Sequence, residues 1–114
     1  VSAPFHCKYM KTASEKMKSY IKDLEITKLN RPIISNVTAE EVSSPGEIKT
    51  LLISQIEKKV RWLESVEYMI NNEVKNFVEI GPGKVLSGLI KRINKDVNVS
   101  SINNDEDIKL LLND

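Results

Sequence analysis

The chain alternates between short β-branched runs and longer stretches in which apolar residues recur every three or four positions. Spacings of three and four place side chains on one face of a helix, whereas short β-branched runs are typical of strands. The pattern therefore predicts an α/β protein with a largely parallel sheet, because strands that alternate with helices pack in that way. The predicted strands are Val1–Phe5, Ile33–Val37, Phe77–Ile80 and Val97–Ile102.

Five helices are predicted between and after these strands. At Ser44-Pro45-Gly46-Glu47 an N-cap serine, proline at the first helical position and glutamate at the third predict a reciprocal capping box. The last helix spans Asp105–Leu112 and is capped by Asn104 or Asp105. The apolar faces of the other four are Met10, Ala13, Met17, Tyr20, Ile21 and Leu24 in a helix from Lys8; Ile48, Leu51, Leu52 and Ile56; Trp62, Val66, Met69 and Ile70; and Val85, Leu86, Leu89, Ile90 and Ile93.

The composition indicates one soluble globular domain. The 114 residues are 40% hydrophobic and 29% charged, and the net charge of +1 gives no overall bias toward nucleic acid or a membrane surface. The single cysteine, Cys7, forms no internal disulfide, which favours a reducing, intracellular setting. Because the sequence lacks an initiator Met and opens within a predicted strand, we expect a fragment or a processed piece.

His6 is the only histidine, and an unperturbed imidazole, with a pKa of about 6.5, can act as a general base near neutral pH. The alternative is an inert polar residue at a strand end. A dyad with Cys7 is sterically awkward, because adjacent residues of an extended segment point to opposite sides. One histidine makes no multi-histidine metal site, and no serine lies in a G-x-S-x-G elbow. None of these motifs therefore supplies a catalytic partner for His6.

Two further features have a functional and a structural interpretation. Gly81-Pro82-Gly83-Lys84 joins a strand to a helix and can present N–H groups to an anion, but the P-loop spacing fails and a simple tight turn is the alternative. The helix that follows carries a basic flank, which is either a solvated surface or a docking site for an acidic or phosphate-bearing partner. The flank consists of Lys84, Lys91, Arg92 and Lys95.

Four motifs in register carry a family resemblance across the whole chain. They are Val1–His6, Ser35–Val37, Gln55–Trp62 and Val78–Leu89. Together they resemble the C-terminal part of the malonyl-CoA:acyl carrier protein transacylase family. The resemblance implies that residues 1–114 form the C-terminal part of an α/β-hydrolase-like domain, with the ferredoxin-like subdomain and the serine elbow outside the chain.

The resemblance also implies a ping-pong acyl transfer. A serine in a G-H-S-x-G elbow takes malonyl from coenzyme A and passes it to the phosphopantetheine thiol of the acyl carrier protein, with His6 as base and the main-chain carbonyl of Gln55 orienting it. Phe5 matches a malonyl-selecting position, and Lys91 and Arg92 match basic residues proposed to dock the carrier. No cofactor or metal is implied. The expected partners are malonyl-CoA, the carrier protein and the missing N-terminal part of the enzyme.

Two other functions remain open on the sequence. One is a non-catalytic α/β module that binds the carrier protein, and the other is a small anion-binding module built on the Gly81–Gly83 turn. The serine, the arginine that pairs with the malonyl carboxylate and the oxyanion-hole donors all belong to the family's N-terminal portion, so we expect the chain alone to be inactive. The cytoplasm is the expected location, with an organellar stroma as the alternative.

Overall fold

The computed structural model describes residues 5–113, which divide into two compact units. The first unit ends at Ser65 and the second begins at Val66, inside helix α3 (Trp62–Asn71). Of the predicted strand Val1–Phe5, residues 1–4 lie outside the described residues, and Phe5 itself lies in a turn.

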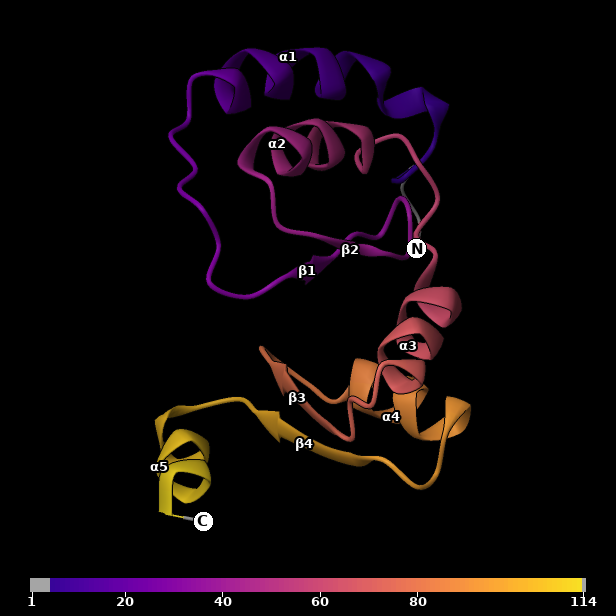
Figure 1. Cartoon of the computed structure of the whole chain (residues 1–114), viewed down its shortest axis with the longest axis vertical. Coiled ribbons are helices and arrows are strands. Elements are labelled where there is room, and N and C mark those ends of the chain that lie inside the picture. The colour runs from indigo at the N-terminus through magenta and orange to yellow at the C-terminus, as the bar shows by residue number, and fades with distance from the viewer. Residues whose placement is uncertain (1–4, 114) are drawn as a thin grey trace. The chain divides into compact units, whose positions relative to one another are not determined.

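Two helices and a hairpin build the first unit. A short 3-10 helix, η1 (Lys8–Met10), leads into α1 (Lys11–Lys22), and α2 (Pro45–Ser54) lies between α1 and a two-stranded hairpin (Figure 1). The buried residues of α1 are Ser14 and Ile21. The predicted face is therefore partly wrong: successive helical residues turn by about 100°, which carries Tyr20 away from the Ser14–Ile21 line and leaves it 70% exposed.

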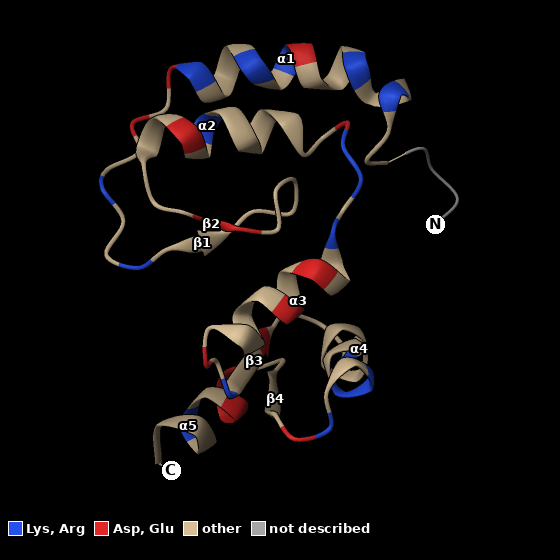
Figure 2. Cartoon of the chain, turned by 45° about the vertical axis from the view of Figure 1, so that its right-hand side comes forward, with Lys and Arg blue, Asp and Glu red and all other residues tan. Residues whose placement is uncertain are grey.

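The outer surface of α1 is basic. Its exposed side chains include four lysines, and Figure 2 shows how densely positive charge follows this helix. The lysines are Lys11, Lys16, Lys18 and Lys22. By contrast, the first turn of α5 (Asp105–Asn113) is acidic, which suits the positive end of the helix dipole.

The predicted strand Ile33–Val37 is wrong in length and in pairing. Strand β1 covers only Ile33–Ile34 and pairs antiparallel with β2 (Glu41–Val42), with Ile33 opposite Val42. The chain turns after Ile34, because the Ser35 N–H donates to Glu40 O at 3.1 Å and the Ser35 hydroxyl accepts from Val37 N at 3.2 Å. Serine side chains offer the backbone such local bonds, and these compete with a sheet ladder.

Helix α2 begins where the sequence predicts, at Pro45 after Ser44, but the capping box is not formed. The Ser44 side chain makes no cap hydrogen bond, and its backbone carbonyl accepts the first helical bond from Ile48 N at 3.0 Å. Ile48 is the buried residue of this helix. The proline and the backbone therefore define the start of α2 without the predicted side-chain bond.

A βαβ arrangement builds the second unit. Strands β3 (Asn76–Ile80) and β4 (Asn98–Ile102) pair in parallel, and α4 (Val85–Ile93) connects them (Figure 1). These elements follow the predicted ones closely. Asn104 rather than Asp105 caps α5, because Asp107 N donates to the Asn104 side-chain oxygen at 3.0 Å.

The structure confirms an α/β protein. Its described strands form two separate two-stranded sheets, so the mainly parallel sheet stays a prediction. Within residues 5–113 one strand pair is parallel and the other antiparallel. No helix in this range is long and apolar enough to cross a bilayer.

Candidate functional site

The only histidine meets the end of α2. Gln55 caps that helix, and carbonyls of a last helical turn lack intrahelical donors. The Gln55 carbonyl oxygen lies 2.7 Å from Nδ1 of His6, a residue 49 positions away in the chain. A carbonyl can only accept, so Nδ1 is the protonated nitrogen and the lone pair of a neutral imidazole is on Nε2. The imidazole therefore presents a basic nitrogen in a fixed tautomer.

The backbone around this contact is unusual. His6 has φ of 54°, a left-handed conformation that few non-glycine residues adopt, and histidine is among those in which it is more frequent. The residue is exposed, and Phe5 beside it is 57% exposed. The structure thus joins His6 to Gln55 and places Phe5 at the same turn, while their roles stay predictions.

The two predicted docking residues differ in their surroundings. The Lys91 ammonium donates to the carbonyl of Val97 at 2.6 Å and to that of Lys95 at 3.3 Å. The Arg92 guanidinium makes no hydrogen bond or ion pair with the described part of the chain. Lys91 is therefore engaged in closing the α4–β4 turn, and Arg92 is the residue of the pair whose charge is unengaged there.

The start of α4 is occupied by a carboxylate of the chain itself. Glu79 accepts hydrogen bonds from Ser87 N at 2.8 Å, from the Ser87 hydroxyl at 2.7 Å and from Leu86 N at 3.3 Å. The bonds from Ser87, followed by the one from Leu86, lower the pKa of Glu79. These two N–H groups of the first helical turn are therefore already paired within the chain and are not open to an external anion.

The glycine turn has a backbone role. Gly81 has φ of 141° and Gly83 has φ of 81°, conformations that other residues rarely adopt. Lys84 follows as the N-cap residue but makes no side-chain cap bond. The tight-turn interpretation therefore accounts for the motif.

Two groups in the structure were not singled out in the sequence. One is Glu79, whose carboxylate reaches forward to the helix after the turn; the other is Arg61, which bonds to the loop between β1 and β2. Glu79 comes just before Gly81 at the end of a strand, a position from which the next helix start is within reach. For Arg61 the only local signal is Glu64 three residues later, and nothing local indicates its bonds to the loop. Within residues 5–113 no cluster of three or more histidine, cysteine or acidic residues is placed to hold a metal ion.

Solved structures of acyl carrier protein S-malonyltransferases share this fold. The enzyme from Bartonella henselae superposes with a TM-score of 0.92 at 40% identity, over 99% of this chain and 36% of that chain. A malonyl-transacylase in complex with its type II PKS acyl-carrier protein matches with a TM-score of 0.88 at 35% identity, over 100% of this chain and 37% of that chain.

Sequence relatives have the same name. The malonyl CoA-acyl carrier protein transacylase of Staphylococcus aureus is 43% identical over 109 residues, which cover 96% of this chain and 35% of the relative. The chain matches no protein-family model. The resemblance drawn from the motifs is confirmed as similarity to these transacylases over almost all of this chain, which spans about a third of the length of the relatives it matches.

Proposed function

We propose that this chain is the histidine-bearing C-terminal part of a malonyl-CoA:acyl carrier protein transacylase. The observation that carries the proposal is the contact between His6 Nδ1 and the Gln55 carbonyl, which leaves Nε2 as a general base. The 43% identity to a transacylase of that name supports the choice of reaction. The full-length enzyme of this proposal is the chain joined to an upstream segment.

His6 moves one proton in each half of the proposed reaction. In the first half, Nε2 takes the proton of a serine hydroxyl supplied by the upstream segment, the serine oxygen attacks the malonyl thioester, and the imidazolium protonates the departing coenzyme A thiolate. In the second half, Nε2 takes the proton of the carrier's phosphopantetheine thiol. The thiolate then attacks the malonyl ester, and the proton returns to the serine oxygen.

The Gln55 carbonyl supports both halves. It accepts the Nδ1 hydrogen bond throughout, and it interacts favourably with the imidazolium that forms between the two proton transfers. The proposed substrates are malonyl-CoA and the phosphopantetheinylated carrier protein, and the proposed chemistry uses no cofactor or metal. Arg92 is the better-placed of the two docking candidates, because the Lys91 ammonium is bonded within the chain.

The finer features of the fold and setting belong to the same proposal. The parallel β3–β4 pair would extend a parallel sheet in an α/β-hydrolase-like core completed by the upstream segment, which would also hold the serine elbow and the ferredoxin-like subdomain. A single cysteine fits a reducing compartment, either the cytoplasm or an organellar stroma. The product would feed fatty acid or polyketide synthesis.

The test is malonyl transfer by the full-length enzyme, followed as a mass increase on the carrier protein. We expect the increase on holo-carrier and none on apo-carrier, which lacks the accepting thiol. Methylmalonyl-CoA should react about 10- to 200-fold less well, since a pocket distinguishes one methyl group by that factor. Replacing Phe5 with Ala should narrow this ratio. A full-length enzyme that acylates no holo-carrier from any acyl-CoA would refute the proposal.

A further inference from the structure

Arg61, just before α3, contacts two parts of the first unit. Its backbone N–H donates to the Asn36 carbonyl at 3.0 Å, and Nη1 donates to the carbonyls of Thr38 at 3.2 Å and Val37 at 3.5 Å. On its other side, Nε lies 3.0 Å from a carboxylate oxygen of Glu64 that Nη2 also contacts. One side chain therefore joins the loop between β1 and β2 to the first turn of α3.

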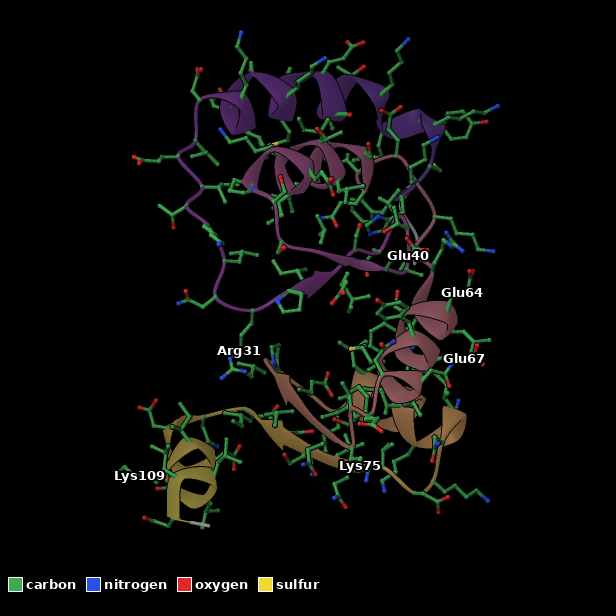
Figure 3. The ribbon with its side chains drawn as sticks, viewed as in Figure 1. Arg31, Glu40, Glu64, Glu67, Lys75 and Lys109 are labelled. Atoms are coloured by element: carbon green, nitrogen blue, oxygen red, sulfur yellow. The ribbon has the colours of Figure 1, made fainter. Side chains whose placement is uncertain are left out.

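Charge and backbone bonds hold Arg61 in this place. The hydrogen bond with Glu64, and then the negative charges of Glu64 and Glu40, raise the pKa of Arg61; Figure 3 labels both carboxylates. Burial opposes the shift only in part. The Arg61 carbonyl accepts from Ser65 N at 3.0 Å and from the Ser65 hydroxyl at 2.7 Å, which fixes its backbone at the start of α3.

The segment between Gln55 and Arg61 is fixed at both ends. At the end of α2, Gln55 N donates to Leu51 O at 2.9 Å, and Lys58 N donates to Ser54 O at 3.0 Å. In the described structure the next two residues donate no backbone hydrogen bond, so Arg61 provides the second anchor. The segment that carries the Gln55 carbonyl therefore depends on the Arg61 contacts for its far end.

The loop that Arg61 holds also borders Gln55 directly. Ser35, Asn36 and Gln55 line one cavity of about 190 Å³, together with apolar residues of the hairpin and α2. A shift of Asn36 away from Arg61 would change the packing beside Gln55. The same loop is thus in contact with Arg61 on one side and lies near the acceptor of the His6 hydrogen bond on the other.

We propose that Arg61 is a positioning residue that holds the Gln55 carbonyl against Nδ1 of His6 and so maintains the tautomer of the base. Its consequence for catalysis rests on the proposed function, whereas its consequence for the His6 tautomer does not. Arg61 itself takes no proton and touches no reacting atom.

The tautomer can be measured on the 114-residue chain, because His6 is its only histidine and ¹⁵N-histidine labelling reports on one imidazole. We expect the neutral ring of the unsubstituted chain to be in the Nδ1–H form. Arg61→Ala should shift it toward the Nε2–H form that free histidine favours. Arg31→Ala, which removes an exposed arginine without a hydrogen bond in the described structure, should leave the spectrum unchanged.

Two milder variants keep the test decisive if Arg61→Ala does not fold. Arg61→Lys retains the charge but not the planar guanidinium, which reaches the two loop carbonyls through Nη1 and Glu64 through Nε and Nη2. Glu64→Gln weakens the bond between Arg61 and the first turn of α3. Both should give an intermediate tautomer shift. An Nδ1–H spectrum unchanged in the folded Arg61 variants, or an Nε2–H form in the unsubstituted chain, would overturn the inference.

The full-length enzyme gives the catalytic readout. Arg61→Ala should lower kcat by about 10- to 100-fold, the size of effect that a misplaced catalytic group produces, with little change in the KM for malonyl-CoA. Arg61→Lys should restore part of the loss. A rise in KM at constant kcat would contradict a positioning role. If the unsubstituted full-length enzyme transfers no malonyl, the proposed function fails while the tautomer result stands by itself.

Discussion

The interactions inside one unit of the chain differ in kind from those inside the other. In the second unit, five residue pairs from Asn76↔Asn98 to Ile80↔Ile102 form a regular parallel ladder covered by α4. In the first unit, the hairpin has only two residue pairs. The candidate site there depends on hydrogen bonds from the side chains of His6 and Arg61 to main-chain carbonyls far away in the sequence. Backbone hydrogen bonds therefore make the second unit a scaffold, whereas the candidate site of the first unit depends on a few side-chain hydrogen bonds.

The largest expected effect is the loss of catalysis when the site that contains His6 is separated from the rest of the enzyme. We expect the 114-residue chain alone to transfer no malonyl, because the serine and the oxyanion donors are expected upstream, and each such donor contributes about 10²- to 10³-fold. Transfer from malonyl-CoA to holo-carrier is the assay, with the full-length enzyme as positive control. Turnover by the chain alone that disappears in His6→Ala would show that expectation to be wrong.

The scaffold role of the second unit predicts a large stability effect at its buried helix face. Ile90 is buried in α4, so Ile90→Ala should cost about 2–5 kcal/mol of unfolding free energy through lost burial and a residual cavity. Val85 in the same helix is 73% exposed, and Val85→Ala should change stability by less than about 0.5 kcal/mol. Denaturant titration of both variants measures the difference. Equal costs would mean that α4 does not pack as described.

The hydrogen bonds of Glu79 make the stability of the second unit depend on pH. Because the pKa of Glu79 is lowered on folding, its contribution is present above the usual value of 4.5 and is lost as the pH falls through the folded-state pKa. Glu79→Gln should lower the Tm at pH 7 and have little effect near the acid end of the titration. Glu67→Gln, at an exposed carboxylate without a hydrogen bond in residues 5–113, serves as control. A Tm difference independent of pH would contradict this account.

The smallest effects are expected at the two docking candidates. Lys91→Met removes two bonds to carbonyls and should cost about 0.5–1.5 kcal/mol of stability with little change in the KM for the carrier. Arg92→Ala should instead leave the Tm unchanged and raise that KM by a salt-dependent factor, as rim charges do. Thermal melts and carrier titrations at low and high salt separate the two. A carrier KM that responds to Lys91→Met alone would reverse the assignment.

The same difference between the units explains how much the sequence could predict. The strands and helices of the second unit follow from local periodicity, so β3, α4, β4 and α5 lie where they were expected. The strand Ile33–Val37 was overextended because β-branched content does not reveal that Ser35 turns the chain back. Likewise, the buried face of α1 is determined by its packing against α2. The apolar spacing includes Tyr20 in that face, although Tyr20 is exposed.

The candidate site was predictable only through the family resemblance. Nothing local connects His6 with Gln55, which lie 49 residues apart and meet through a side chain and a main-chain carbonyl. No sequence pattern indicates the bonds from Arg61 to the loop between β1 and β2, because their acceptors are main-chain carbonyls, which any residue type supplies. The residue type identifies His6 as a group that can carry a proton, and the fold supplies the Gln55 carbonyl that orients it.

The most direct test of the central claim compares His6→Ala with Gln55→Ala in the full-length enzyme. If His6 is the general base and only the main chain of Gln55 orients it, His6→Ala should lower kcat for malonyl transfer by about 10²- to 10⁴-fold. Gln55→Ala keeps the carbonyl that accepts from Nδ1 and should stay within a few-fold of the unsubstituted enzyme. Comparable losses in the two variants, or a His6→Ala enzyme with unchanged turnover, would contradict the account.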